Sequence, residues 1–319
     1  MKRKIMGLIF LSMMLAFSSV AMAEYPDKPI NVLVGFAPGG EADTSTRALC
    51  ELAGKILRQP IVVINKPGGT GSVALASVKK EAPDGYNLCQ VSGGIFIAQH
   101  IRELPFDLAK DFTPIMRYAD FVVPLMVKND SPWKTLKEVV EYAKANPGKI
   151  RYGTSGSGSV YHLAMETLAL QEGLKLIHIP FKSCGLSDMA LLGGHIEVEV
   201  CPASNFKSNI RSGQTRLLTS FTGTRLPSFP EIPTASELGY NIKMKHMAAI
   251  VGPKGLPKAV VDKLDRAFKE AMERPEFKKL LMDIEMPSVY RNSDDLTREF
   301  KELTDYYKIL VAQTGLKEE

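Results

Sequence analysis

Several common signatures are missing from the chain, and each absence excludes a class of protein. There is no Cys-x-x-Cys pair, which excludes a zinc ribbon and a thioredoxin-type motif. There is no GxGxxG or GxxxxGK[ST] loop, so the usual dinucleotide and nucleoside triphosphate sites are absent. The GxSxG elbow of serine hydrolases and the HExxH zinc motif are missing too. The sequence therefore matches none of these catalytic templates.

Charge of one sign and long hydrophobic runs are also scarce. Lys and Arg number 40 against 35 Asp and Glu, and this net charge of +5 is too small and too evenly spread for a nucleic-acid surface. After residue 23, no run approaches the about 18 consecutive apolar residues of a membrane-spanning helix. Hydrophobic residues make up 45% and charged residues 24%, as in a globular protein. A length of 319 residues predicts two domains, with one large domain still possible.

The N-terminus carries the pattern of a secretory signal peptide. A basic head, Lys2 to Lys4, precedes an apolar run over residues 5–20, and Ala21-Met22-Ala23 supplies the small residues of a cleavage site. We therefore predict a signal peptide over residues 1–23. An uncleaved anchor is the alternative, but the run is short for a bilayer, which needs about 20 residues. Without the three basic residues the net charge would be +2. The sequence predicts an exported protein.

The four cysteines suit an exported protein. Cys50, Cys89, Cys184 and Cys201 are even in number, and disulfides persist outside the cytoplasm. Three full pairings are possible, and free buried thiols are an alternative, because a chain of this size needs no covalent staple.

Apolar strand-like runs alternate with amphipathic helical runs after residue 23. We expect strands at 30–36, 60–64, 87–91, 121–127, 151–153, 177–179 and 196–200. We expect helices at 44–57, 136–145, 187–192, 259–273, 276–283 and 293–313, the last capped by Ser293. Repeated β-α units predict an α/β fold with a mostly parallel, doubly wound sheet flanked by helices.

Two loops of this pattern are suited to binding an anion. Parallel sheets bind ligands at the carboxyl ends of their strands, where helix N-termini present backbone N–H groups. The first loop, residues 35–43, contains Gly39 and Gly40, and Asp43 is expected to cap the helix that follows. In the second loop, residues 153–159, six of the seven residues are Gly or Ser. The alternative is that both are ordinary tight turns.

Other candidate chemistry is weaker. His195, Glu197 and Glu199 alternate along an expected strand and would share one face, which could hold a metal, although a solvated face is the favoured interpretation. We expect His162, near the start of its helix, to order the second loop or to donate to a ligand rather than to act as a general base. The residues do not supply the nucleophile, base and orienting group that an enzyme needs.

An ordered series of motifs resembles one family over essentially the whole chain after residue 23. These segments are Tyr25-Pro26, Pro29-Ile30, 36–43, 63–68, 83–86, 111–115, 152–162, 179–182 and 191–194. In this series the chain resembles the periplasmic solute receptors of tripartite tricarboxylate transporters, the Bug-type binding proteins.

The resemblance implies a two-domain Venus-flytrap fold with the ligand between the domains. Domain 1 would comprise residues 24–121 and 244–319, and domain 2 residues 122–243, with crossings near Asp120–Val123 and Lys243–Met247. In such receptors the two loops hold a carboxylate from opposite domains. Carried over, the ligand-binding positions are Phe36, Ala37, Pro38, Gly39, Gly40, Asp43, Ser155, Gly156, Ser157, Gly158, Ser159 and His162.

The implied function is periplasmic capture of a small di- or tricarboxylate or related organic acid. The partners would be the large and small multi-spanning membrane subunits of the transporter, with no cofactor, metal, nucleic acid or catalysis. The alternatives are an exported α/β hydrolase that uses a loop serine and a sensor subunit. Because a bridge between domains would oppose hinge motion, we expect any disulfides to stay within a domain, as Cys50 with Cys89 and Cys184 with Cys201.

Overall fold

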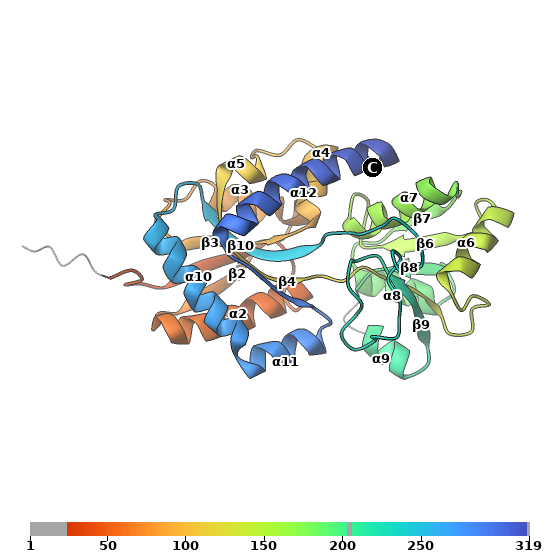
Figure 1. The fold of residues 1–319 in the computed structure, drawn as a ribbon, viewed down its shortest axis with the longest axis horizontal. Coiled ribbons are helices and arrows are strands. Elements are labelled where there is room, and N and C mark those ends of the chain that lie inside the picture. The colour runs from red at the N-terminus through yellow and green to blue at the C-terminus, as the bar shows by residue number, and fades with distance from the viewer. Residues whose placement is uncertain (1–23, 203–205, 318–319) are drawn as a thin grey trace, which may run out of the picture.

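The chain folds into two α/β lobes, each built on one sheet. The computed structural model describes residues 24–202 and 206–317, and the predicted signal peptide lies outside them. Figure 1 places the two lobes side by side along the long axis of the molecule. We call the lobe with the six-stranded sheet the first lobe and the lobe with the five-stranded sheet the second lobe.

The strands divide between the sheets by position in the chain. The first lobe holds β1 (Ile30–Val34), β2 (Ile61–Asn65), β3 (Asn87–Ser92), β4 (Phe112–Asp120), β10 (Met247–Pro253) and β11 (Ser288–Arg291). The second lobe holds β5 (Pro124–Lys128), β6 (Arg151–Thr154), β7 (Ile177–Pro180), β8 (Val198–Val200) and β9 (Thr215–Ser220).

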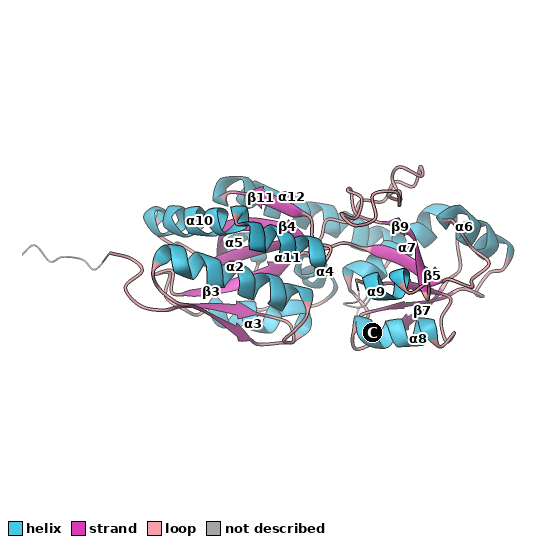
Figure 2. Ribbon diagram, turned by 90° about the horizontal axis from the view of Figure 1, so that it is seen from below, coloured by secondary structure: helices cyan, strands magenta, loops and turns pink. Residues whose placement is uncertain are grey.

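The helices flank both sheets (Figure 2). Those before the first crossing are α2 (Glu41–Leu57), α3 (Ser72–Val78), α4 (Gly94–Ile101) and α5 (Leu108–Asp111). Those between the crossings are α6 (Leu136–Ala145), α7 (Val160–Glu172), α8 (Cys184–Leu192) and α9 (Phe206–Arg211). The C-terminal helices are α10 (Lys258–Glu273), α11 (Pro275–Asp283) and α12 (Ser293–Thr314).

Both sheets have the same mixed pairing. In the first lobe, ordered β11-β4-β10-β3-β1-β2, β1 pairs in parallel with β2 and β3, whereas β10 is antiparallel to β3 and β4. In the second, ordered β7-β6-β8-β5-β9, β6 pairs in parallel with β7 and β8, whereas β5 is antiparallel to β8 and β9. The predicted α/β fold is confirmed. The reversed strands β5 and β10 are the first strands that the chain forms after each passage between sheets.

The chain passes between the lobes twice. β4 ends at Asp120 and β5 begins at Pro124, and the return falls between the end of β9 at Ser220 and the start of β10 at Met247. The C-terminal helix α12 holds the returning segment, because the Tyr307 hydroxyl donates to the Lys245 carbonyl at 2.7 Å and accepts from the Lys245 N–H at 3.1 Å. The same helix contacts α4 and β4 of the first lobe and α7 of the second.

The starts of some helices and strands differ from those expected, in part because a different residue caps the helix. Helix α2 begins at Glu41, because Gly40 rather than Asp43 is its N-cap. Helix α12 is capped by the Asn292 side chain, which accepts the Asp295 N–H at 2.9 Å, while the Ser293 hydroxyl donates to the Pro114 carbonyl. The expected strand 121–127 begins only at Pro124, because the preceding residues form the first crossing.

One predicted disulfide is confirmed and the other is wrong. Cys184, the first residue of α8, is bonded to Cys201 just after β8, with Cα atoms 5.6 Å apart. Cys50 and Cys89 are free and buried. They lie in different hydrophobic clusters: Cys50 of α2 packs in the same cluster as Leu88, whereas the neighbouring Cys89 belongs to the other cluster. Successive strand residues face opposite sides, so the two thiols cannot meet.

We expect loss of the Cys184–Cys201 bridge to destabilise the protein. The bridge closes a segment with a sequence separation of 17 residues, and a loop of that size contributes about 2–4 kcal/mol by restricting the unfolded chain. The double variant Cys184→Ser/Cys201→Ser should lose that amount in urea denaturation, and dithiothreitol should have the same effect on the wild type. As a control, the double variant Cys50→Ala/Cys89→Ala should keep its sensitivity to dithiothreitol. Equal stability with and without reductant would contradict the prediction.

Candidate functional site

The first loop joins β1 to the N-terminus of α2. Ala37, Pro38, Gly39 and Gly40 are exposed, and Phe36 is half-buried. Gly39 has a φ of +83°, a left-handed conformation that favours glycine. Because Gly40 brings no side-chain cap to the helix, no N-cap side chain accepts the first N–H groups of α2.

Asp43 holds this loop in shape from the first turn of α2. Its buried carboxylate accepts the Gly39 N–H at 2.9 Å, the Arg47 Nε–H at 2.9 Å and the Asn65 Nδ2–H at 2.7 Å. Burial alone would raise the pKa of Asp43, but these hydrogen bonds outweigh it and hold the pKa below its usual value. The geometry therefore gives Asp43 a positioning role in the loop.

Replacing Asp43 by asparagine should lower the free energy of unfolding and reduce its dependence on pH in acid. We expect a loss of about 1–3 kcal/mol in urea at pH 7, moderated because Arg47 is half-exposed to screening solvent. Since the folded-state pKa is lowered, the wild-type contribution is present above about pH 4 and is lost as the pH falls through that pKa. The variant should lose less stability than the wild type between pH 5 and pH 3. The control Glu51→Gln, an exposed ion-pair partner on the same helix, should behave as wild type.

The second loop joins β6 to the N-terminus of α7 and is tied by side chains of its own lobe. The Ser159 hydroxyl is the N-cap and accepts the His162 N–H at 3.1 Å. The Gly158 N–H donates to His162 Nδ1 at 3.2 Å. A Cβ on Gly158 would lie 2.3 Å from Ile101 Cδ1, so this glycine lies directly against the first lobe. His162 therefore orders the second loop, which is one of the two roles that we expected for it.

A second imidazole that sequence reasoning missed supports this arrangement. The rings of His162 and His178 stack with centroids 3.7 Å apart and an interplanar angle of 15°. His178 Nε2 lies 2.8 Å from the Thr154 hydroxyl, and that hydroxyl also contacts the Gly156 backbone. Burial lowers the pKa of His178 to about 4, so its ring is neutral at pH 7. The stack therefore links β7 to the start of the second loop.

The helices that follow the two loops converge between the lobes. Tyr161, in the first turn of α7, is buried, and beyond its burial the Glu41 carboxylate at the start of α2 raises its pKa. The Tyr161 ring also lies 5.7 Å from His246 in the returning crossing, and His246 lies 4.8 Å from Phe121 in the first crossing. None of these four residues belonged to the predicted site, and only their position beside the loops and crossings could have suggested them.

This arrangement can bind an anion without a nucleophile. Each helix directs the partial positive charge and the unpaired N–H groups of its first turn toward the region between the lobes. His162 Nδ1 is engaged by a backbone N–H, and Nε2 lies 3.7 Å from Glu166. The Ser159 hydroxyl is engaged as a helix cap. Backbone dipoles and loop hydroxyls are the groups that carry the chemistry.

His195, Glu197 and Glu199 do not form the solvated face that the sequence favoured, because Glu199 is buried. Glu197 accepts from the Arg151 backbone N–H at 2.7 Å and from its guanidinium. Glu199 is fully buried on β8, and burial raises its pKa to about 8. Across residues 24–202 and 206–317, no group of three or more His, Cys, Asp or Glu side chains is placed to hold a metal ion.

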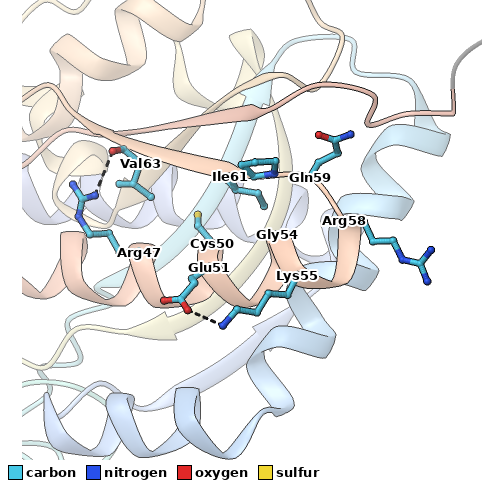
Figure 3. Close-up of a pocket in the computed structure, with 10 residues that line it drawn as sticks. Arg47, Cys50, Glu51, Gly54, Lys55, Arg58, Gln59, Ile61 and Val63 are labelled. Carbon is cyan, nitrogen blue, oxygen red and sulfur yellow. Dashed lines mark hydrogen bonds and ion pairs between the residues drawn. The ribbon is translucent and has the colours of Figure 1, made fainter.

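Two larger cavities lie away from the loops. One, of about 540 Å³, runs between α2 and β2, where Cys50 points inward between Arg47 and Ile61 (Figure 3). The other, of about 490 Å³, lies beside the C-terminal half of α2 and the helix α10. Every residue that lines either cavity belongs to the first lobe, so neither brings the two loops together.

Comparison with protein families and curated proteins gives consistent matches. Residues 46–316 match the family described as the tripartite tricarboxylate transporter family receptor. A UPF0065 protein from the gbd 5′ region of Cupriavidus necator is 37% identical over 92% of this chain and 89% of its own length. The protein BugT of Bordetella pertussis is 30% identical over 80% of this chain and 79% of its own length.

Solved structures share the fold over nearly the whole chain. A periplasmic transporter structure matches with a TM-score of 0.82 and 31% identity over 92% of this chain and 99% of its own. The periplasmic binding protein BugD matches at 0.79 and 28%, over 92% and 100% of the two chains. MatC of Rhodopseudomonas palustris, solved with bound malate, matches at 0.77 and 26%, over 90% and 100%. Within the part of this chain that the structure describes, no helix has the length and apolar character to cross a membrane.

Proposed function

The chain belongs to the receptor family of the tripartite tricarboxylate transporters, and on that premise we propose that it captures a small organic acid between its lobes and delivers it to a membrane transporter. Residues 1–23 would direct it to the periplasm and be removed. The membrane partners would be one large and one small multi-spanning subunit.

The observation that carries this proposal is the convergence of two helix N-termini from different lobes. Glu41 begins α2 in the first lobe and lines a cavity together with Lys207 of the second lobe, and Gly158, just before α7, lies directly against Ile101 of the first lobe. A carboxylate placed between these termini would meet N–H groups and positive dipole ends from both sides. Such a ligand favours closure of the lobes, because only the closed form satisfies it from both sides.

We assign the ligand contacts to the two loops and separate them from positioning residues. The contacts would come from Phe36, Ala37, Pro38, Gly39, Gly40, Ser155, Gly156, Ser157, Gly158 and Ser159. Asp43 and His162 would shape those loops through the hydrogen bonds described above. The domains would comprise residues 24–121 with 244–319, and residues 122–243. The segments 120–123 and 243–247 would then act as hinges.

The test begins with a thermal-shift screen of small acids, including malate because of MatC, followed by calorimetry on the best acid. Gly40→Ala should lower the affinity at least tenfold without changing stability. Gly40 has φ −75°, and a Cβ there would meet only the Ala37 carbonyl at 3.8 Å, so the methyl group obstructs the ligand rather than the fold. The control Gly173→Ala, at φ +67° and the far end of α7, should cost about 1 kcal/mol of stability and leave affinity unchanged.

Two outcomes would contradict the proposal. Unchanged affinity in Gly40→Ala would remove the first loop from the binding site. Hydrolysis of an ester panel by the wild type, abolished in Ser157→Ala, would instead indicate the alternative hydrolase.

A further inference from the structure

A small cavity between the lobes lies beside the first loop. Its volume is about 70 Å³, and it is lined by Gly39, Glu41 and Thr44 of the first lobe, by Lys207 of the second, and by Asp283 at the end of α11. A water molecule needs about 10–15 Å³ of such space, so the cavity admits a small polar group of a ligand.

Among the described residues, Lys207 is the only cation that lines this cavity, and its ammonium group already has other partners. The Lys207 ammonium group has three N–H donors. The group donates to the Met282 carbonyl at 3.0 Å and to the Asp283 carbonyl at 3.2 Å, and it forms an ion pair with Glu285 Oε1 at 2.8 Å. The Asp283 carboxylate pairs with Lys279 at 2.6 Å. The positive and negative charges around the cavity are therefore balanced without Glu41.

Glu41 is the remaining acidic residue that lines the cavity. Among the described residues, the Glu41 carboxylate has no hydrogen-bond or ion-pair partner. Arg47 is the nearest cation along α2, but it is engaged by Asp43 and Asn65. Burial raises the pKa of Glu41 to about 8. Tyr161, which faces it from α7, is neutral and so supplies no compensating charge. Glu41 is half-buried, and a carboxylate in this position is stabilised by a cationic hydrogen-bond donor.

We propose that Glu41 binds a positively charged nitrogen of the solute, so that the ligand is a zwitterionic acid such as an amino acid rather than a plain dicarboxylate. This inference rests on the proposed receptor function and specifies the substrate class of the same site. The carboxylate of the ligand is held by the loop N–H groups, and its ammonium group donates to Glu41. A plain dicarboxylate would place a second negative charge near Glu41 and be disfavoured.

The experiment uses pairs of acids that differ only by the amine. Isothermal titration calorimetry of the full-length mature protein would compare alanine with propionate, aspartate with succinate and glutamate with glutarate. We expect an amine-bearing acid to bind at least tenfold tighter than its partner. Titration at pH 7 in buffers of different ionisation enthalpy should reveal release of a proton, because the ammonium group displaces the one held by Glu41.

Variants separate the role of Glu41 from that of the loops. Glu41→Gln should weaken the amine-bearing acid by about 10- to 100-fold and leave its amine-free partner unchanged or tighter. The control Glu51→Gln, the same change on the exposed side of α2, should bind as wild type. Melting temperatures would verify that both variants fold.

Three results would overturn the inference. Tighter binding of the amine-free acids without proton release would mean that protonated Glu41 donates to a carboxylate, and the proposed receptor function would stand. An equal loss for both members of a pair in Glu41→Gln would make Glu41 a positioning residue. If no acid of either kind bound, both the inference and the proposed function would fail.

Discussion

Lys207→Met is expected to lower the free energy of unfolding by about 3–5 kcal/mol, because it leaves the Glu285 carboxylate buried between the lobes without its cation. Glu285 is 0% exposed and lies just after α11 in the first lobe, at φ +56°. It forms an ion pair with Lys207 at 2.8 Å and accepts the Ser228 N–H at 3.0 Å, both in the second lobe. Methionine has a similar length and fills the space without the charge.

A double-mutant cycle in urea gives the matched test. Lys207→Met/Glu285→Gln should be more stable than Lys207→Met alone, since removing both charges leaves no uncompensated ion. The control Lys279→Met breaks an exposed pair with Asp283 on α11 and should change stability little. A Lys207→Met variant within about 1 kcal/mol of wild type would exclude a strong ion pair between the lobes.

Gly35→Ala is expected to lower the free energy of unfolding by at least about 4 kcal/mol, more than most overpacked sites. A Cβ on Gly35 would lie 2.3 Å from the backbone Cα of Gly71, so backbone rather than a flexible side chain must move. The turn at Gly69–Gly71 cannot shift away easily. Thr70 is tied to Arg102 at 3.0 Å and packs against Gly94, where a Cβ would lie 2.7 Å from its Cγ2.

The measurement is urea denaturation of Gly35→Ala against Gly40→Ala, five residues along the same loop. Only the first should be destabilised, because Gly40 has room for a Cβ and an ordinary φ. Similar stabilities of the two variants would show that the turn yields without cost. Gly35 thus holds the first loop at its position beside α3 and α4, which is a role in the fold rather than contact with a ligand.

The two acidic side chains near the interlobe cavity differ in their partners. Glu285 is paired with Lys207, whereas Glu41 has no partner among the described residues. Lys207 forms its ion pair with Glu285 and not with Glu41, although Lys207 and Glu41 line the same cavity. The ammonium group of Lys207 contacts Glu285 and the carbonyls of Met282 and Asp283, and Glu41 is not among its partners in the described chain. Stability and ligand recognition would then be separable at residues that line one cavity.

The sequence by itself determined the α/β class and the two loops after β1 and β6, because alternation of apolar residues and glycine-rich turns are local patterns. It also indicated the Cys184–Cys201 bridge. It did not predict the long strands β4 and β10, which pair antiparallel although more than 100 residues separate them. Such pairing depends on which apolar segments meet in space, and no local periodicity encodes it.

Only the tertiary structure decided which side chains meet between the lobes. Cys50 and Cys89 are kept apart because β3 directs neighbouring residues to opposite faces of its sheet. Glu41, Tyr161 and His246 come from α2, α7 and the returning crossing, and they converge because two sheets and two crossings bring those segments together. Residue type marks each of these side chains as polar or aromatic. The chemistry of the site also depends on how deeply each side chain is buried and on whether a charged partner lies beside it, and both are decided by the tertiary structure.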